Sequence, residues 1–316
     1  MKILFLIILV LVGLLTALEI GLRSLFGFGK PLIYLGDSQI GYLLAPNQHT
    51  RRYGNKIEIN QFSMRSSPIE KIPAPATLRV LLLGDSIANG GWWTDQKNTI
   101  SNLMLDSLKS AIADKYQQVE VLNASANSWG PRNELAYLQR FGNFSAQVVV
   151  LLINTDDLFA TNPTSVQVGR DRNYPDSKPA LALIEVWQRY LTKQQPIPEL
   201  QAIQKEGGDR VGVNLEAIGK IQALANQHNS KFLLAMTPLL REIGKPVPLD
   251  YEIKARQRLS DFTKVQQIPY IDFLPLFNAS PNPKALYHDT IHMNLQGNQF
   301  VSGVIERSLL EILSLN

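Results

Sequence analysis

The chain has 316 residues, enough for one large α/β domain with added segments or for two small domains. Its 45% hydrophobic and 18% charged residues exclude a disordered or low-complexity protein. The net charge of +4 is too small and too scattered to indicate a nucleic-acid partner. The sequence contains no cysteine, which excludes disulfides, a thiolate nucleophile, cysteine-ligated zinc and iron–sulfur clusters.

Residues 1–24 are predicted to be a membrane anchor or a signal segment. Residues 3–18 carry no charge, and with Glu19 at the membrane surface the apolar stretch extends to Arg23, giving about 20 residues and ~30 Å of helix. A signal peptide is the alternative, although residues 14–19 are a poor cleavage site, and a buried core helix is disfavoured because every face is apolar. We expect a transmembrane helix with the large domain outside the cytoplasm, periplasmic or extracellular; cleavage would instead give a secreted protein.

Residues 25–77 are rich in proline, glycine and asparagine and lack a helical period. Residues 56–59 alternate apolar and polar side chains as in a short strand. We interpret this segment as a linker and a lead-in β segment that packs on the main domain, with Pro68, Pro73 and Pro75 marking its end.

From residue 78 to residue 316 the pattern repeats strand, loop and helix, which predicts one domain built on a parallel, doubly wound sheet covered on both faces. The predicted strands are residues 78–83, 119–122, 148–153, 231–236 and 269–273. The predicted helices are residues 100–115, 134–141, 215–226, 251–265 and 295–313, the last with Asn294 as N-cap. Residues 159–208 interrupt the pattern with five prolines, and we expect an insertion over the active-site face that carries one helix at residues 180–193.

A serine, an aspartate and a histidine, the residue types of a nucleophilic triad, follow two of these strands: Ser86, Asp289 and His292. Gly84-Asp85-Ser86 comes directly after the first strand, and Asp289 and His292 follow the fifth. Loops beyond the carboxyl ends of parallel strands meet at one edge of the sheet, so these residues can converge. His292 would take the proton of Ser86, and Asp289 would bind the other ring nitrogen and select its tautomer.

Gly84-Asp85-Ser86 together with Asp289-x-x-His292-x-Asn294-x-x-Gly297 resembles the GDSL/SGNH hydrolase superfamily. The resemblance covers about 240 residues, from Leu78 to the C-terminus. It implies a flavodoxin-like three-layer α/β/α sandwich with a five-stranded parallel sheet. It also implies hydrolysis of esters, or transfer of acyl groups, through a serine acyl-enzyme.

The family's two middle blocks provide the hydrogen-bond donors of the oxyanion hole, together with the backbone N–H of Ser86. Matched to residues 123–131, the second block places its backbone donor at Ser128 or at Gly130, depending on the alignment. The third block places a side-chain amide at Asn154, whereas an alternative alignment puts Asp156 there. An ionised carboxylate would repel an oxyanion, which favours Asn154.

Three tryptophans, Trp92, Trp93 and Trp129, fall in the two loops predicted to surround Ser86, where they would stack on a sugar or cover an acyl chain. Ordinary packing beneath the insertion is the alternative. His288 and His292 are four residues apart, but without a third ligand or a thiolate we predict no metal. No nucleotide-binding fingerprint and no Gly-x-Ser-x-Gly elbow occurs, so we predict no cofactor and no nucleotide partner.

The sequence therefore predicts a membrane-anchored serine esterase that acts on an ester-bearing small molecule, lipid or glycan. Two alternatives stay open at this point. One is an O-acyltransferase in which a polysaccharide hydroxyl replaces water, and the other is a non-catalytic envelope protein that keeps the fold as a binding module.

Overall fold

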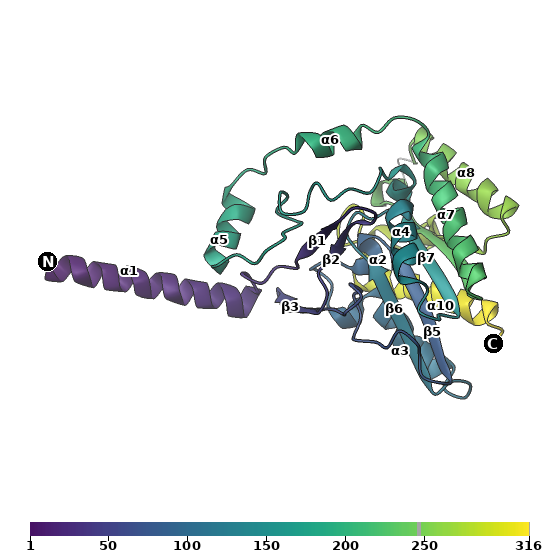
Figure 1. Ribbon diagram of the computed structural model, residues 1–316, viewed down its shortest axis with the longest axis horizontal. Coiled ribbons are helices and arrows are strands. Elements are labelled where there is room, and N and C mark those ends of the chain that lie inside the picture. The colour runs from purple at the N-terminus through teal and green to yellow at the C-terminus, as the bar shows by residue number, and fades with distance from the viewer. Residues whose placement is uncertain (245–247, 316) are drawn as a thin grey trace.

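The computed structural model of the chain describes residues 1–244 and 248–315 (Figure 1). Its centre is a sheet of five strands in the order β6-β5-β7-β8-β9, and every neighbouring pair is parallel. The strands are β5 (Thr77–Gly84), β6 (Gln118–Ser125), β7 (Val148–Asn154), β8 (Lys231–Thr237) and β9 (Tyr270–Asp272). All five predicted strands are confirmed, and the order is the doubly wound, flavodoxin-like one.

Helices cover both faces of this sheet and complete three layers. On one face lie α3 (Ile100–Ala111), α9 (Phe273–Asn278) and α10 (Leu295–Ile312), and on the other lie α4 (Pro131–Phe141), α7 (Arg210–Gln227) and α8 (Asp250–Val265). Alternate residues of β5 enter the two cores, Val80 and Leu82 on the α10 side and Leu81 and Leu83 on the α4 side. The predicted sandwich is confirmed. Short helical turns are α2 (Ser86–Asn89), η2 (Gln96–Asn98), η3 (Thr155–Phe159), η5 (Leu240–Glu242) and η6 (Pro283–Leu286).

Two β-hairpins precede the sheet. They pair β1 (Tyr34–Asp37) with β2 (Gly41–Leu44), and β3 (Gln48–Arg52) with β4 (Asn55–Ile59). Tyr42, Leu44, Ile57 and Ile59 are buried in the same core as α4. These hairpins are therefore part of the packed body of the protein.

Residues 159–208 differ from the single helix expected there. The structure has α5 (Ala182–Val186), which continues as the π-helical turn η4 (Trp187–Leu191), and a second helix α6 (Pro198–Gln204). The prolines in this segment suggest a loop, but Pro198 occupies the first turn of α6, where its missing N–H costs nothing. The segment leaves the body, passes the end of α1 and returns to α7 (Figure 1).

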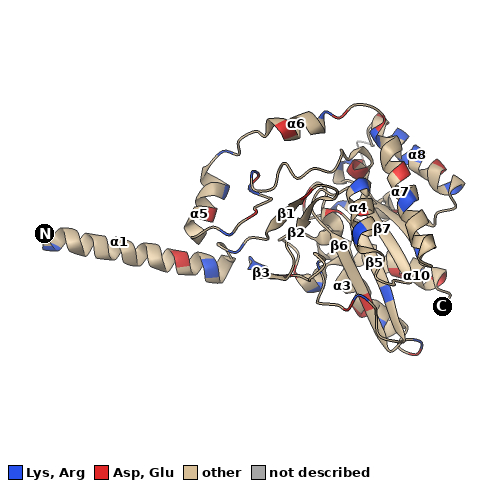
Figure 2. Ribbon diagram, in the orientation of Figure 1, with Lys and Arg blue, Asp and Glu red and all other residues tan. Residues whose placement is uncertain are grey.

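At the N-terminus, α1 (Lys2–Gly21) and η1 (Leu22–Phe26) form one helical stretch that extends away from the body (Figure 1). None of its residues is buried, and it carries charge only near its two ends (Figure 2). By length and composition it is able to cross a membrane, a criterion that a signal sequence also meets.

The burial of the hairpins predicts that they unfold together with the sheet. Replacing Ile59, which is 1% exposed, by alanine should lower the free energy of unfolding by about 2–5 kcal/mol. The matched control is Ile72→Ala, at a position that is 76% exposed, with an expected change within about 0.5 kcal/mol. Denaturant titration of the full chain in detergent measures both. A separate early transition in Ile59→Ala, with the main transition unmoved, would show that the hairpins fold on their own.

Candidate active site

Ser86 is presented by the turn between β5 and α2. Gly84 ends the strand, and a Cβ there would lie 2.6 Å from the carbonyl oxygen of Leu152 on β7, so the close approach requires glycine. Asp85 caps α2, its Oδ1 accepting a hydrogen bond of 2.8 Å from the N–H of Ile87. Ser86 therefore stands at the carboxyl edge of the sheet as the first residue of a helical turn.

The structure brings Ser86, His292 and Asp289 together, although Ser86 and His292 are 206 residues apart in sequence. The His292 Nε2 atom lies 2.8 Å from Ser86 Oγ, and His292 Nδ1 lies 2.7 Å from Asp289 Oδ2. Asp289 Oδ1 accepts hydrogen bonds of 2.8 Å from the N–H groups of Ile291 and His292. This turn fixes both the carboxylate and the ring that it contacts.

The same hydrogen bonds favour the ionised form of Asp289. Partial burial acts to raise its pKa, but the backbone N–H groups of His292 and Ile291 and the His292 ring outweigh burial. The pKa of Asp289 therefore lies below its ordinary value, which leaves a carboxylate facing the imidazole.

The two predicted backbone donors after β6, Ser128 and Gly130, differ in whether their N–H groups are already hydrogen-bonded. The N–H of Gly130 already donates to Asn133 Oδ1 at 3.1 Å, and a Cβ at Gly130 would collide with Ala160. Packing thus requires glycine at position 130. Its assignment as an oxyanion donor stays a prediction, and the hydrogen bond to Asn133 favours Ser128 over it. Ser128 instead has a left-handed backbone, with a φ of 59°, and it borders a cavity that also reaches Ser86. The N–H of Ser128 has no partner among the described residues.

Asn154, at the end of β7, is 3% exposed and borders a cavity with Ser86. Its amide donates to Asp85 Oδ2 at 2.8 Å and to Asp157 Oδ2 at 3.0 Å. Asp156 has a side chain that is 47% exposed and forms an ion pair of 2.9 Å with Arg241. The geometry therefore favours Asn154 over Asp156 at this position of the site.

The three tryptophans have three different environments. Trp92 is 43% exposed and lines the cavity, as predicted for the rim. The Trp93 ring also lines it and packs against the imidazole of His292, with ring centroids 4.5 Å apart. Trp129 borders a different cavity at Ser86, but it is only 1% exposed, and its Nε1–H donates to the carbonyl of Tyr42 at 3.0 Å. Packing against the β1–β2 hairpin explains Trp129.

Arg65 is a residue that the sequence analysis missed. Its fully buried guanidinium donates to the carbonyl groups of Asn89, Gly91 and Thr94. These carbonyls belong to the loop that carries Trp92 and Trp93. No local pattern marks Arg65, because its partners lie 24 to 29 residues further along the chain.

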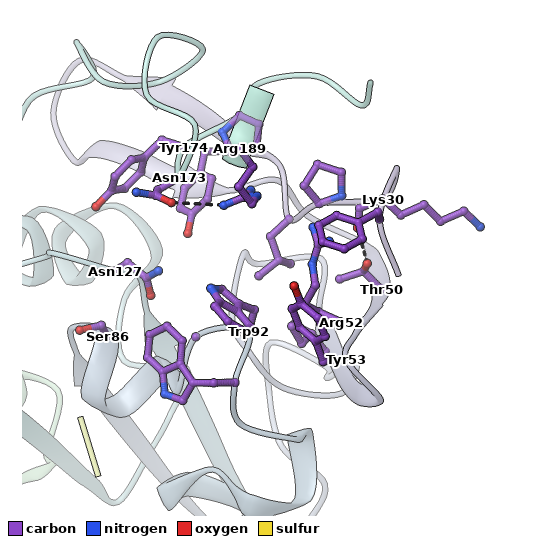
Figure 3. A pocket seen from close by; sticks show the side chains of 18 of the residues that line it. Lys30, Thr50, Arg52, Tyr53, Ser86, Trp92, Asn127, Asn173, Tyr174 and Arg189 are labelled. Carbon is purple, nitrogen blue, oxygen red and sulfur yellow. Dashed lines mark hydrogen bonds between the residues drawn. The ribbon is translucent and has the colours of Figure 1, made fainter. Parts of the chain in front are cut away.

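Two cavities meet at Ser86 and His292. One, of about 300 Å³, is lined by aromatic rings and extends past Trp92 to Tyr53 and Lys30 (Figure 3). The other, of about 510 Å³, lies toward α6 and contains Asn154. Within residues 1–244 and 248–315, no group of three or more acidic, histidine or cysteine side chains is placed to hold a metal.

This geometry agrees with comparisons to known proteins. The model of the GDSL-like lipase/acylhydrolase family matches residues 82–300. The chain belongs to this family. It is therefore an ester-hydrolysing enzyme, a GDSL-type acylhydrolase.

Solved structures with a similar fold include Axe2, an acetylxylan esterase from Geobacillus stearothermophilus, at 12% identity and a TM-score of 0.48, covering 75% of this chain and 95% of that one. A GDSL-like lipase from Bacteroides thetaiotaomicron has 13% identity and a TM-score of 0.45, covering 77% and 93%. Comparison with curated proteins gives no match.

Behind the serine of this acylhydrolase lies a buried group of carboxyls, Asp85, Asp157 and Glu134. Burial raises the pKa of all three, and repulsion between them adds to the shift of Asp157 and Glu134. Glu134 is 0% exposed, and neither of its carboxyl oxygens has a hydrogen-bond partner among the described residues. At a given pH the group therefore carries less negative charge than three free carboxylates would.

A group whose pKa is raised on folding costs stability as the pH rises from its unfolded value toward its folded value. Glu134→Gln removes this cost, because an amide does not ionise. The variant should gain stability over the wild type above pH 4.5, the ordinary pKa of glutamate, by up to about 1.4 kcal/mol per pH unit. Unfolding titrations from pH 4.5 to pH 8 measure this difference. The exposed Glu70→Gln is the matched control. A stability difference for Glu134→Gln that does not change with pH would contradict a raised pKa of Glu134.

Proposed function

We propose that this acylhydrolase is a serine esterase in which Ser86 is the nucleophile, His292 the general base and acid, and Asp289 the residue that orients the ring. The observation that carries this proposal is the continuous chain of contacts, 2.8 Å from Ser86 Oγ to His292 Nε2 and 2.7 Å from His292 Nδ1 to Asp289. With its Nδ1 proton directed at Asp289, the imidazole has a free lone pair on Nε2 for the serine proton.

In the first half-reaction Ser86 Oγ attacks the ester carbonyl while its proton moves to His292 Nε2. Collapse of the tetrahedral intermediate breaks the ester C–O bond, and His292 returns the proton to the leaving alcohol. In the second half, His292 takes a proton from water, the resulting hydroxide attacks the acyl-enzyme, and the proton returns to Ser86 Oγ as the acid leaves. Throughout, Asp289 would stabilise the imidazolium.

The oxyanion would be held by the backbone N–H groups of Ser86 and Ser128 and by the amide of Asn154. Ser86 is the first residue of α2, where helix geometry leaves its N–H without an intrahelical partner. Both amide hydrogens of Asn154 are bound to carboxyls in the free enzyme. One of them would transfer from Asp85 to the oxyanion, whose full charge makes it the stronger acceptor.

We further place α1 as an uncleaved anchor that holds the enzyme on the outer side of a membrane. The support is the contact of α1 with the body. Glu19 accepts hydrogen bonds from the N–H groups of Ala182 and Leu183, at 2.8 Å and 3.0 Å, and Arg23 donates to the carbonyl of Ala180 at 2.9 Å. Removal of residues 1–23 would leave the N–H groups of Ala182 and Leu183 and the carbonyl of Ala180 without these partners.

The nucleophile assignment predicts covalent labelling by a fluorophosphonate, which traps an activated serine. The full chain in detergent should be labelled, Ser86→Ala should not, and kcat for p-nitrophenyl acetate should fall on the order of 10⁴-fold or more in Ser86→Ala and in His292→Ala. Ser128→Ala is the matched control and should keep its label, because only its backbone N–H is used. A folded wild type that stays unlabelled would overturn the proposal.

The oxyanion assignment predicts a loss confined to kcat. Asn154→Ala should lower kcat by about 10²–10³-fold with KM unchanged, since the amide binds charge that develops only in the transition state. Asp156→Asn should stay near the wild type, because Asp156 pairs with the exposed Arg241. Ester hydrolysis by both variants, at matched thermal stability, measures this. The reverse pattern would support the alignment that places Asp156 in the site.

A further inference from the structure

The helical segment α5–η4 has one face fixed to the protein and another that is exposed and apolar. On the fixed face Glu185 is 5% exposed; it accepts a hydrogen bond of 2.6 Å from the N–H of Gly29 and forms an ion pair with Arg52. Five large apolar side chains are exposed by 38% to 66%: Leu181, Ile184, Trp187, Tyr190 and Leu191. Their spacing of three to four residues places most of them on one stripe of the helix.

This exposed stripe adjoins the end of α1. Glu19 on α1 binds the N–H groups of Ala182 and Leu183, so the start of α5 is fixed at the level where the uncharged part of α1 ends. Figure 1 shows α5 beside this end of α1 and away from the central sheet. A membrane that α1 enters would therefore have its surface at the height of α5.

The residue types on this segment suit the interface between lipid and water. Tryptophan and tyrosine favour the headgroup level of a bilayer, and Trp187 and Tyr190 are 60% and 57% exposed. Between residues 178 and 193 the only acidic residue is the buried Glu185, whereas Lys178 and Lys193 are exposed. The exposed charge within this range is positive, which complements anionic headgroups, and the nearest exposed carboxyl, Asp176, lies just before it. These features favour a lipid surface over a protein partner.

The aromatic cavity at Ser86 opens toward the same place. Its far wall contains Phe28, which lies two residues after the end of η1, together with Tyr53 and Tyr190. The hydroxyl groups of Tyr53 and Tyr190 are 2.8 Å apart, and the Tyr190 ring packs edge-on against Phe28. Tyr190 thus belongs both to the cavity and to the exposed stripe, and Figure 3 shows Tyr53 and Lys30 at the end of the cavity opposite Ser86.

We propose that residues 181–191 are a second membrane-contacting element, which lies in the headgroup region and places the mouth of the Ser86 cavity at the bilayer surface. This rests on the proposed anchoring by α1. The ester then reaches Ser86 from the membrane, so the substrate class is an amphiphilic ester whose apolar part stays in the lipid. Lys30 and Arg189 at the cavity wall would contact an anionic headgroup.

The absence of native cysteine allows a direct test with single-cysteine variants of the full chain. A nitrobenzoxadiazole fluorophore is attached at Trp187→Cys, Leu191→Cys, Val10→Cys in α1, and Val265→Cys in α8. The last position is 78% exposed and belongs to α8, the helix that Figure 1 shows at the opposite end of the molecule from α1. Each variant is reconstituted in vesicles of phosphatidylcholine and phosphatidylglycerol. At positions 187 and 191 we expect blue-shifted emission, quenching by spin-labelled lipid, and several-fold slower reduction by aqueous dithionite than at position 265.

Quenching at position 10 without quenching at positions 187 and 191 would overturn the proposal while leaving the anchor intact. No lipid quenching at any position would remove the anchor and the proposal together. Protection from dithionite at 187 and 191 without lipid quenching would show that protein covers the stripe, a second copy or another partner, and would also overturn the proposal. None of these readouts depends on Ser86, so failure of the esterase assignment is detected separately by the fluorophosphonate.

Discussion

The parallel pairing of β5 between β6 and β7 is the constraint on which the site depends. Gly84 allows β5 to approach β7 closely enough for Asp85 and Ser86 to turn outward at the strand end. The loop after β6 presents Ser128 and the end of β7 presents Asn154 at the same edge, and the chain after β9 brings His292 to Ser86. Four loops meet there because parallel strands all end on one side of the sheet.

At this edge of the sheet the pKa values of the carboxyl groups are shifted in opposite directions. Asp289 is partly exposed and accepts three hydrogen bonds, so its pKa is lowered and it faces His292 as a carboxylate. Asp157 and Glu134 are buried, and their pKa values are raised by burial and by repulsion from Asp85. Ionisation is thus favoured at Asp289, which faces His292, and disfavoured at Asp157 and Glu134. Sites that separate the pKa values of neighbouring acids in this way can assign them different tasks.

The sheet, its order and the meeting of Ser86 with His292 could be predicted because each depends on local patterns, namely apolar strands and a short motif at a strand end. Features that depend on distant partners could not. Arg65 binds a loop more than twenty residues away, and Trp129 is buried by a hairpin some eighty residues earlier in the chain. Gly130 showed that a glycine near an active site can be required by a neighbouring methyl group, here that of Ala160, as readily as by an oxyanion. Pro198 begins a helix although prolines generally indicate loops.

The strand ends of the sheet position Ser86 and His292, whereas segments outside the sheet form the walls of the aromatic cavity. Phe28 comes from the chain after α1, Tyr53 from the β3–β4 hairpin and Tyr190 from η4, and all three line the cavity that begins at Ser86. Glu19 and Glu185 join two of these segments through hydrogen bonds to backbone N–H groups, so the cavity wall and the apolar helix form one connected unit. Any displacement of α1 therefore acts on the cavity wall, because α5 is bonded to both. With α1 anchored in a bilayer as proposed, these few contacts would couple the position of the protein at the lipid surface to the access of an ester to Ser86.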